Sequence, residues 1–452
     1  MAGTQSILIG ETFARYRIWD AKRSLDYLIS RPEVDGDQIG VTGCSGGGTV
    51  TTYISALDPR VKVAAPACYI QSFEVLFPGS IGDSEQSLPG FIAAGLDITD
   101  YIELFAPKPW LISSTEKDFF TPAGAKVAYD EAREWFKIYG MEDRLRWVVG
   151  PGGHGTPLQV REAIYEWMIK WLKNGKGTKD EEKVHMYTVQ ELHATKSGQV
   201  AVDYGSRDLQ AILKENLIAK KKQGSVAELR AELKKLMAAQ GDFEFKTEWL
   251  LPEGPGKHAG VIVVETAGAM PSARARAFQK AGAIVLSLWP RGLPATENRR
   301  YLAGEWTSAT RAWLVGKNIP AMRAADIQRG VEMMSARDDI GSVYAAASEV
   351  SGIWLLMAAA VEPRIAGIWL DKTPYSYRAS YDKPIHKNMH EVTIPGFLLH
   401  WDIEDMVKAM DGRKVLWTDP SDWMQQVTKL SGKYEYRYLE QPDEDFVKKL
   451  LP

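Results

Sequence analysis

The sequence predicts an α/β fold in two units, each a mostly parallel β-sheet with helices on its faces. Short apolar runs typical of buried strands alternate with stretches of helical periodicity, both before residue 175 and after residue 243. This alternation indicates parallel sheets, because parallel strands need crossover helices to connect them. A chain of 452 residues is also long enough for two or three domains.

The first unit begins with a helix expected over 15–28, where Trp19, Leu25 and Leu28 share one apolar face. The glycine-dotted segment 70–104 is irregular and suits a cap or an active-site wall. The remaining elements expected in this unit are strands at 39–42, 61–65, 109–113 and 145–149, and helices at 50–57, 125–139 and 161–172.

The most informative stretch joins the strand at 39–42 to the helix that follows it. It reads Gly43-Cys44-Ser45-Gly46-Gly47, a G-x-S-x-G pattern between a strand and a helix. In a nucleophile elbow the serine sits on a strained turn at this place. Gly43 and Gly47 fit because such a turn crowds its neighbours and because glycine tolerates unusual backbone angles. We therefore interpret Ser45 as a candidate nucleophile.

A serine nucleophile needs a base to take its proton and an acid to orient that base. In enzymes built around a nucleophile elbow, the order of these groups along the chain is serine, acid, histidine. Ser45, Asp118 and His154 follow predicted strands in that order, and His154 lies in a Gly-Gly-His-Gly turn. Glu116 is the alternative acid, but we favour Asp118 because it lies further into its loop. The three residues form a candidate catalytic triad.

The oxyanion hole is the incomplete part of this site. One backbone N–H donor is expected from Gly46, the residue after the nucleophile. The second normally comes from an early strand-to-helix loop, but only 44 residues precede Ser45. The N-terminal residues, the second domain or another chain could supply it. The sheet edge beside the elbow strand is also expected to be bare, which invites a homodimer or packing of the second domain.

The second α/β pattern is expected to form a complete sheet. Its predicted strands lie at 260–264, 283–287, 342–345, 365–369, 396–399 and 434–439, with helices at 321–335 and 353–360. Before it, residues 176–242 are expected to form a linker that contains a hairpin within 184–202 and a helical segment at 209–239. The predicted domains are therefore residues 1–175, 176–242 and 243–452.

The two units show the signs of a distant internal repeat. Asp58-Pro59-Arg60-Val61 and Glu362-Pro363-Arg364-Ile365 both stand between a helix and a strand. A second correspondence pairs residues 108–112 with residues 394–398. The repeat suggests that the second unit descends from the same kind of sheet as the first.

The elbow itself is not repeated. Counting from the two Pro-Arg pairs places Glu349 opposite Ser45, whereas counting from the preceding strands places Ala347 there, with Ser348 between them. Asp443-Glu444-Asp445 stands where the first unit has its histidine turn. We interpret the second unit as a degenerate, catalytically inactive domain.

Composition excludes several classes of function. The net charge of −3 and the pI near 6.2 do not indicate the basic surface that binds nucleic acid. No apolar run is long enough to span a bilayer. Two cysteines, Cys44 and Cys68, exclude a disulfide framework and a cysteine-rich metal site, leaving either two free thiols or one disulfide. We expect no cofactor, no metal, and no nucleic-acid or membrane partner. The start of the chain lacks a signal-peptide pattern, so the cytoplasm is the default location.

Residues 10–175 resemble the C-terminal half of the acetyl-xylan-esterase and prolyl-oligopeptidase-related branch of α/β-hydrolases. The matching features are Trp19-Asp20, Asp26-Tyr27-Leu28, Gly43-Cys44-Ser45-Gly46-Gly47-Gly48-Thr49, Asp58-Pro59-Arg60-Val61, Asp118-Phe119-Phe120 and Gly152-Gly153-His154-Gly155. Residues 243–452 resemble this fold only in their strand pattern. The resemblance implies a serine carboxylesterase that hydrolyses small acyl esters, such as acetylated carbohydrates, through an acyl-enzyme on Ser45.

Two other functions fit the same residues. A non-catalytic scaffold or binding protein is consistent with the partial first unit and the degenerate second one. A peptidase or amidase could use the same triad, although the chain has no β-propeller repeats of the prolyl-oligopeptidase kind. Replacing the serine separates the first of these from an esterase, and a choice of peptide or ester substrates separates the second.

Overall fold

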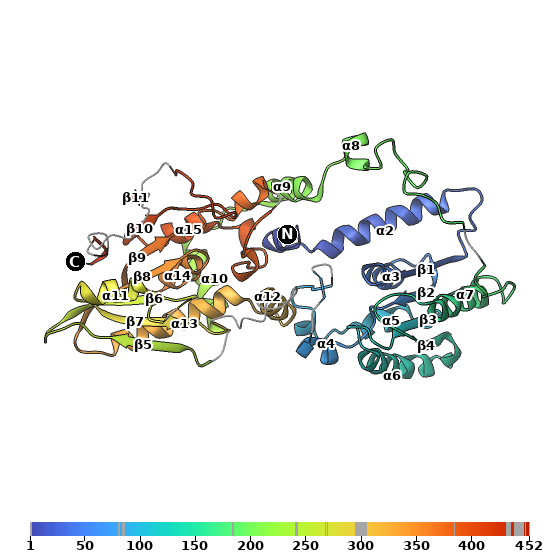
Figure 1. Ribbon diagram of the computed structural model, residues 1–452, viewed down its shortest axis with the longest axis horizontal. Coiled ribbons are helices and arrows are strands. Elements are labelled where there is room, and N and C mark those ends of the chain that lie inside the picture. The colour runs from blue at the N-terminus through green and yellow to red at the C-terminus, as the bar shows by residue number, and fades with distance from the viewer. Residues whose placement is uncertain are drawn as a thin grey trace. The chain divides into compact units, whose positions relative to one another are not determined.

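The chain folds as two compact units (Figure 1). The elbow unit is Thr12–Ser206, and the seven-strand unit combines Met1–Glu11 with Arg207–Pro452. The computed structural model describes residues 2–79, 82–83, 86–182, 185–239, 243–266, 268, 270–293, 305–383, 385–430, 435–437, 447 and 449–451.

These units differ from the predicted domains at two places. The first 11 residues belong to the seven-strand unit, where Ile7 and Leu8 of α1 (Ala2–Leu8) are buried. Residues 207–242, predicted as part of a linker, also belong to it, because α9 (Leu209–Lys220) and α10 (Val226–Ala238) bury their apolar faces there. Both regions have apolar side chains that need a core, and this core is the one that the seven-strand unit provides.

The elbow unit is built on a four-stranded parallel sheet in the order β1-β2-β3-β4. On one face, Val160, Ile164 and Trp167 of α7 pack against apolar side chains of β2 and β3. The helices α3 and α6 contact strands of the same sheet. The elements of this unit are α2 (Phe13–Ile29), β1 (Ile39–Cys44), α3 (Gly46–Leu57), β2 (Val61–Ala67), α4 (Phe73–Gly79), α5 (Thr99–Phe105), β3 (Trp110–Thr115), α6 (Pro122–Ile138), β4 (Leu145–Gly150), α7 (Leu158–Leu172) and α8 (Val200–Tyr204).

The seven-strand unit has the strand order β11-β10-β9-β8-β6-β7-β5, in which only β5 is antiparallel to its neighbour. Every residue of α14 is buried, so this helix lies at the centre of the core. Besides α1, α9 and α10, the elements are β5 (Lys246–Leu250), β6 (His258–Val264), α11 (Ala273–Lys280), β7 (Ile284–Trp289), α12 (Glu305–Leu314), α13 (Ile319–Ser335), β8 (Ile340–Ser348), α14 (Ser351–Val361), β9 (Ile365–Asp371), α15 (Ile403–Lys408), β10 (Lys414–Thr418) and β11 (Glu435–Arg437).

The predicted fold class is confirmed as α/β with mostly parallel sheets, in a partial first unit and a complete-looking second unit. The difference lies beside the elbow strand. In the seven-strand unit β8 pairs with β9 on one side and with β6 on the other. In the elbow unit β1 pairs with β2 and ends the sheet, so within the described residues its other edge has no strand partner. Among the described residues, no helix combines the length and apolarity needed to cross a bilayer.

Two predicted elements are wrong. Residues 397–399 form a short 3₁₀ helix instead of a strand, because Gly396 after Pro395 takes a left-handed backbone (φ 75°) that ends any extended run. The strand beside β9 is β10, so residues 108–112 correspond to this strand and not to 394–398. The predicted hairpin is also wrong: residues 185–202 contain no strand, and their apolar side chains, such as Met186 and Val202, are exposed.

The repeat extends to the strand register. Ile39 pairs with Val61, and the register then shifts by one residue so that Gly40 pairs with Val63. Val343 pairs with Ile365, followed by the same shift, so that Tyr344 pairs with Gly367. The arginines after the two helices repeat as well: Arg60 binds Asp58 and Arg364 binds Glu362 through matching side-chain and backbone hydrogen bonds. The two pairs of strands are therefore equivalent residue by residue.

Candidate active site

Ser45 sits on a sharp turn between β1 and α3. Its backbone angles are φ 59° and ψ −120°, outside the regions that side chains other than glycine favour. Its N–H donates to Ala67 O at 3.0 Å, and its own carbonyl accepts the Thr49 N–H at 2.9 Å. These bonds from β2 and α3 hold the strained conformation in place. The sequence predicted such an elbow, and the structure has one.

Tight packing around the turn explains two of its glycines. A Cβ at Gly43 would lie 2.6 Å from the backbone of Gly47, and a Cβ at Gly48 would lie 2.6 Å from Ala67 O. A Cβ at Gly47 itself would meet no atom within 4 Å. The positions that need glycine are therefore Gly43 and Gly48, whereas the motif drew attention to Gly43 and Gly47.

Asp118 and His154 are brought together at the ends of β3 and β4. His154 Nδ1 lies 2.9 Å from Asp118 Oδ1, which also accepts the Phe120 N–H at 3.0 Å. The Asp118 side chain is fully buried, whereas 29% of the His154 side chain is exposed. If Nδ1 carries the proton that it donates to the carboxylate, Nε2 keeps its lone pair and can act as a base. Glu116, the alternative acid, is exposed.

Backbone and side-chain hydrogen bonds fix the two loops that carry this pair. The Thr115 hydroxyl donates to Gly153 O at 2.9 Å, and the Lys117 N–H donates to Gly152 O at 2.9 Å. Gly152 has φ 87°, a conformation that favours glycine. Gly152 and Gly153, the two residues directly before His154, therefore hold the histidine turn to the loop that carries Asp118 by hydrogen bonds.

The structure does not join Ser45 to this pair. Within the described part of the chain, the Ser45 hydroxyl makes no hydrogen bond, to His154 or to any other residue. Catalytic hydrogen bonds are often long in the absence of substrate and tighten when substrate binds. Gly46, the expected oxyanion donor, is the first residue of α3, and N–H groups in the first turn of a helix have no partner within the helix.

The sequence did not predict a place in the site for two side chains that lie beside the pair. Phe119 stacks on the His154 ring, with centroids 4.5 Å apart and planes at 26°, while 54% of it remains exposed. Cys68, directly after β2, is buried and donates its thiol to Gly155 O at 3.0 Å. The Asp-Phe-Phe sequence could have indicated the first. The position of Cys68 beside the pair depends on which strands are neighbours, and the sequence alone does not determine this.

Both cysteines are free thiols, so the sequence-level alternative of one disulfide is wrong. Burial raises the pKa of the Cys68 thiol to about 12 and also raises the pKa of Cys44. At neutral pH both thiols are therefore protonated and are poor nucleophiles.

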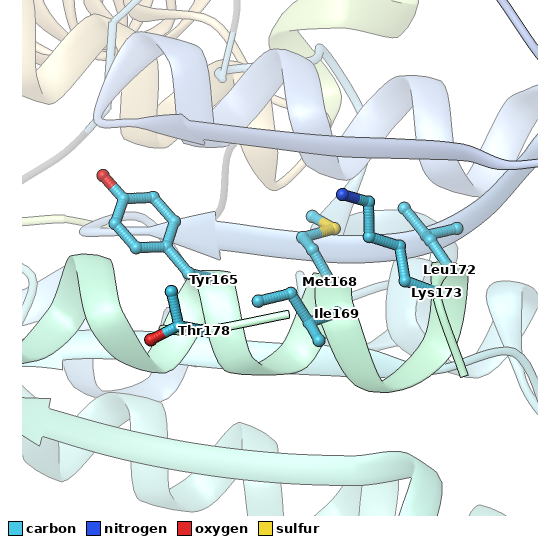
Figure 2. Close-up of a pocket in the computed structure, with 6 residues that line it drawn as sticks. All are labelled: Tyr165, Met168, Ile169, Leu172, Lys173 and Thr178. Atoms are coloured by element: carbon cyan, nitrogen blue, oxygen red, sulfur yellow. The ribbon is translucent and has the colours of Figure 1, made fainter. Parts of the chain in front are cut away.

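A pocket of about 340 Å³ lies elsewhere in the elbow unit (Figure 2). It is lined by side chains of α7 and by two residues that follow this helix: Tyr165, Met168, Ile169, Leu172, Lys173 and Thr178. None of these residues belongs to the predicted triad. Met168 and Leu172 approach Gly40, where a Cβ would lie within 3 Å of both, so this pocket lies alongside β1.

The equivalent place in the seven-strand unit has the same backbone and different chemistry. Glu349 follows β8 with φ 51°, and its N–H donates to Asp371 O at 2.7 Å, as Ser45 does to Ala67. The register equivalence therefore assigns Glu349, and not Ala347, to the serine position. Arg274 forms a largely buried ion pair with Asp371 at the end of β9. The predicted counterpart of the histidine turn, residues 443–445, lies outside the described residues.

Comparison with known proteins gives one similar sequence. No family model matches the chain. It is 29% identical over 175 residues to a protein of Bacillus subtilis (strain 168) named "Putative hydrolase YtaP". The match covers 37% of this chain and 57% of that protein, so the chain spans little more than half the length of this curated relative.

Solved structures of several esterases are similar to part of the chain. A CE15 glucuronoyl esterase from Caldicellulosiruptor kristjansonii is 21% identical, with a TM-score of 0.31 over 39% of this chain and 55% of the esterase. The methylesterase BT1017 is 26% identical, with a TM-score of 0.30 over 39% and 43%. A "putative acetyl xylan esterase" from Bacteroides fragilis NCTC 9343 is 10% identical, with a TM-score of 0.40 over 52% and 80%. These partial likenesses do not bear on substrate or mechanism.

Proposed function

We propose that this chain is a serine carboxylesterase with the α/β-hydrolase fold. It hydrolyses small acyl esters, acetylated carbohydrates among them, through an acyl-enzyme on Ser45. The observation that carries the proposal is the hydrogen bond between His154 and the buried Asp118, in the same unit as a strained serine elbow. The similarity to a protein named as a hydrolase supports the same class of reaction.

Acylation uses each group according to its position. Ser45 Oγ attacks the ester carbonyl carbon while His154 Nε2 takes the hydroxyl proton. The electron pair of the carbonyl moves to its oxygen, which accepts the Gly46 N–H. One such donor is typically worth about 3 kcal/mol in the transition state. When the tetrahedral intermediate collapses, the bond to the alcohol breaks and His154 returns the proton to the leaving oxygen.

Deacylation repeats these steps with water. His154 takes a proton from water, the hydroxide oxygen attacks the acyl carbon, and the bond to Ser45 Oγ breaks as His154 protonates it. Asp118 keeps the imidazole in one tautomer and stabilises its positive charge in both halves of the cycle. These acylation and deacylation steps require neither a metal nor a cofactor.

The second oxyanion donor comes, in this proposal, from whatever covers the free edge of β1, for instance a second copy of the chain. The free edge is also the observation that favours a rival, a non-catalytic scaffold that uses the edge for binding. Sedimentation at micromolar concentration tests the homodimer: a strict monomer would contradict it. Assays with peptide and ester substrates separate an esterase from a peptidase with the same triad.

The test of the proposal is hydrolysis of a short-chain aryl ester by the wild type and two variants. Ser45→Ala removes the nucleophile, and we expect turnover to fall to the background rate. Glu349→Ala changes the equivalent position of the other unit, and we expect it to leave turnover within about twofold of the wild type. Retained activity in Ser45→Ala, or an inactive wild type, would contradict the proposal.

A further inference from the structure

Cys68, Asp118 and His154 bring three different metal-binding groups together beside the elbow. Each offers one ligand atom, and the three atoms lie within 4.8 Å of one another. Thiolate, carboxylate and imidazole are the ligands that Zn²⁺ takes in proteins. Tetrahedral zinc with bonds of about 2.0–2.3 Å spaces its ligands roughly 3.3–3.8 Å apart, so small movements of these side chains would close the site.

The surroundings of the three groups suit an ion that enters from solvent. Cys68 and Asp118 are buried and would form the inner side of the site. His154 is partly exposed and would form the outer side. A site with three protein ligands leaves the fourth position for water. The proposed catalytic cycle assigns no role to the Cys68 thiol, which donates a hydrogen bond to Gly155 O in the structure.

We propose that Cys68, Asp118 and His154 form a zinc site, and that Zn²⁺ is a reversible inhibitor of the esterase. On binding, the thiol releases its proton to solvent and the thiolate bonds to zinc. The Nδ1 atom of His154, 2.9 Å from the carboxylate, loses its proton to solvent and bonds to the ion, while Nε2 takes up a proton from solvent. The imidazole then carries its proton on Nε2, where it can no longer accept one from Ser45.

Zinc binding and zinc inhibition depend differently on the proposed function. Inhibition has meaning only if the chain hydrolyses esters through Ser45. Binding does not, because it requires only the three ligands. The test therefore measures zinc binding and hydrolysis separately.

Binding is measured by titrating ZnCl₂ into the full chain, stripped of metal beforehand, with isothermal calorimetry. Cys68→Ser is the main variant, because its hydroxyl can still donate to Gly155 O but provides no thiolate. Cys44→Ser is the matched control, since it changes the only other cysteine. We expect one Zn²⁺ per chain in the wild type and in Cys44→Ser. In Cys68→Ser we expect affinity to fall at least about 100-fold, beyond what loss of a supporting contact costs.

The second measurement is aryl ester hydrolysis at increasing ZnCl₂, followed by EDTA. We expect activity of the wild type to fall in proportion to zinc occupancy and to return on chelation. A wild type without stoichiometric binding, or a Cys68→Ser that binds as tightly as the wild type, would overturn the site. Full occupancy with undiminished hydrolysis would overturn the inhibition. A chain that binds zinc and hydrolyses no ester would keep the site and refute the esterase instead.

Discussion

Ser45 and Glu349 occupy equivalent positions in the two sheets of this chain, with φ of 59° and 51° and the same hydrogen bond to the neighbouring strand. In the unit of Ser45, a buried carboxylate and an imidazole on the loops after β3 and β4 form a hydrogen bond. Around Glu349 the structure places an arginine, Arg274, in an ion pair with Asp371. The strained turn is thus present with and without a nucleophile.

The backbone conformation of the elbow is therefore set by packing within each sheet. The chemistry at the elbow depends instead on the side chains that surround it. Gly48 and its equivalent Gly352 are both held against the strand that follows: a Cβ would lie 2.6 Å from Ala67 O in one unit and 1.9 Å from Thr373 Oγ1 in the other. This packing keeps the turn sharp in both units. Strain at Ser45 is therefore weaker support for catalysis than the Asp118–His154 pair.

The largest expected effect is on the acid of the triad. Asp118→Asn should lower kcat for an aryl ester by about 10⁴-fold, because the imidazole loses the partner that fixes its tautomer. Glu116→Gln is the matched control, since this carboxylate is exposed and two residues away; its activity should stay within about twofold. Steady-state kinetics on both variants checks the assignment. Equal losses in the two variants would contradict it.

The second expected effect is a loss of unfolding free energy, which can be measured for each unit on its own. Gly48→Ala and Gly352→Ala each place a methyl group against atoms that cannot easily move, and each should cost about 2–4 kcal/mol of unfolding free energy. Gly47→Ala has open space and lies in a helix, so it should be neutral or stabilise by up to about 1 kcal/mol. In urea unfolding followed by far-UV circular dichroism, the first two variants should shift different transitions. A shift of one and the same transition by both variants would show that the two units unfold together.

The smallest effect concerns the repeated ion pairs of Arg60 with Asp58 and of Arg364 with Glu362. The hydrogen bonds from each arginine lower the pKa of its carboxyl partner. A lowered pKa gives stability that is present above the ordinary pKa of the carboxyl and is lost as pH falls through the lowered value. Arg60→Ala and Arg364→Ala should therefore each cost about 1 kcal/mol at pH 7 and less at an acidic pH below the ordinary pKa of both carboxyls. Thermal unfolding at the two pH values checks this, and equal losses at both would contradict it.

Much of the fold could be predicted because its strands are short apolar runs bounded by turns. All four strands of the elbow unit and five of the second sheet (β6, β7, β8, β9 and β11) lie where the sequence placed them. The strand at Lys414–Thr418 was missed because the apolar run at 396–399 looked stronger, yet Gly396 turns that run into a helix. In residues 185–202, alternating apolar residues predicted strands, but no neighbouring strand is there to pair with them.

The site could be predicted only as far as chain order determines it. Ser45, Asp118 and His154 each follow a strand, and parallel strands end at one edge of a sheet, so their order was informative. The place of Cys68 depends on which loops touch, and this follows from packing between strands rather than from local sequence. The choice between Glu349 and Ala347 likewise required the register of β8 and β9.

The most direct test of the central claim is covalent labelling of the full chain with a fluorophosphonate, followed by peptide mass spectrometry. An activated serine Oγ attacks phosphorus and expels fluoride, so the label reports a nucleophile without assuming a substrate. We predict a single adduct on Ser45 that is absent from Ser45→Ala and retained in Glu349→Ala. No adduct on the folded wild type, or an adduct on Ser348 in the second unit, would contradict the account.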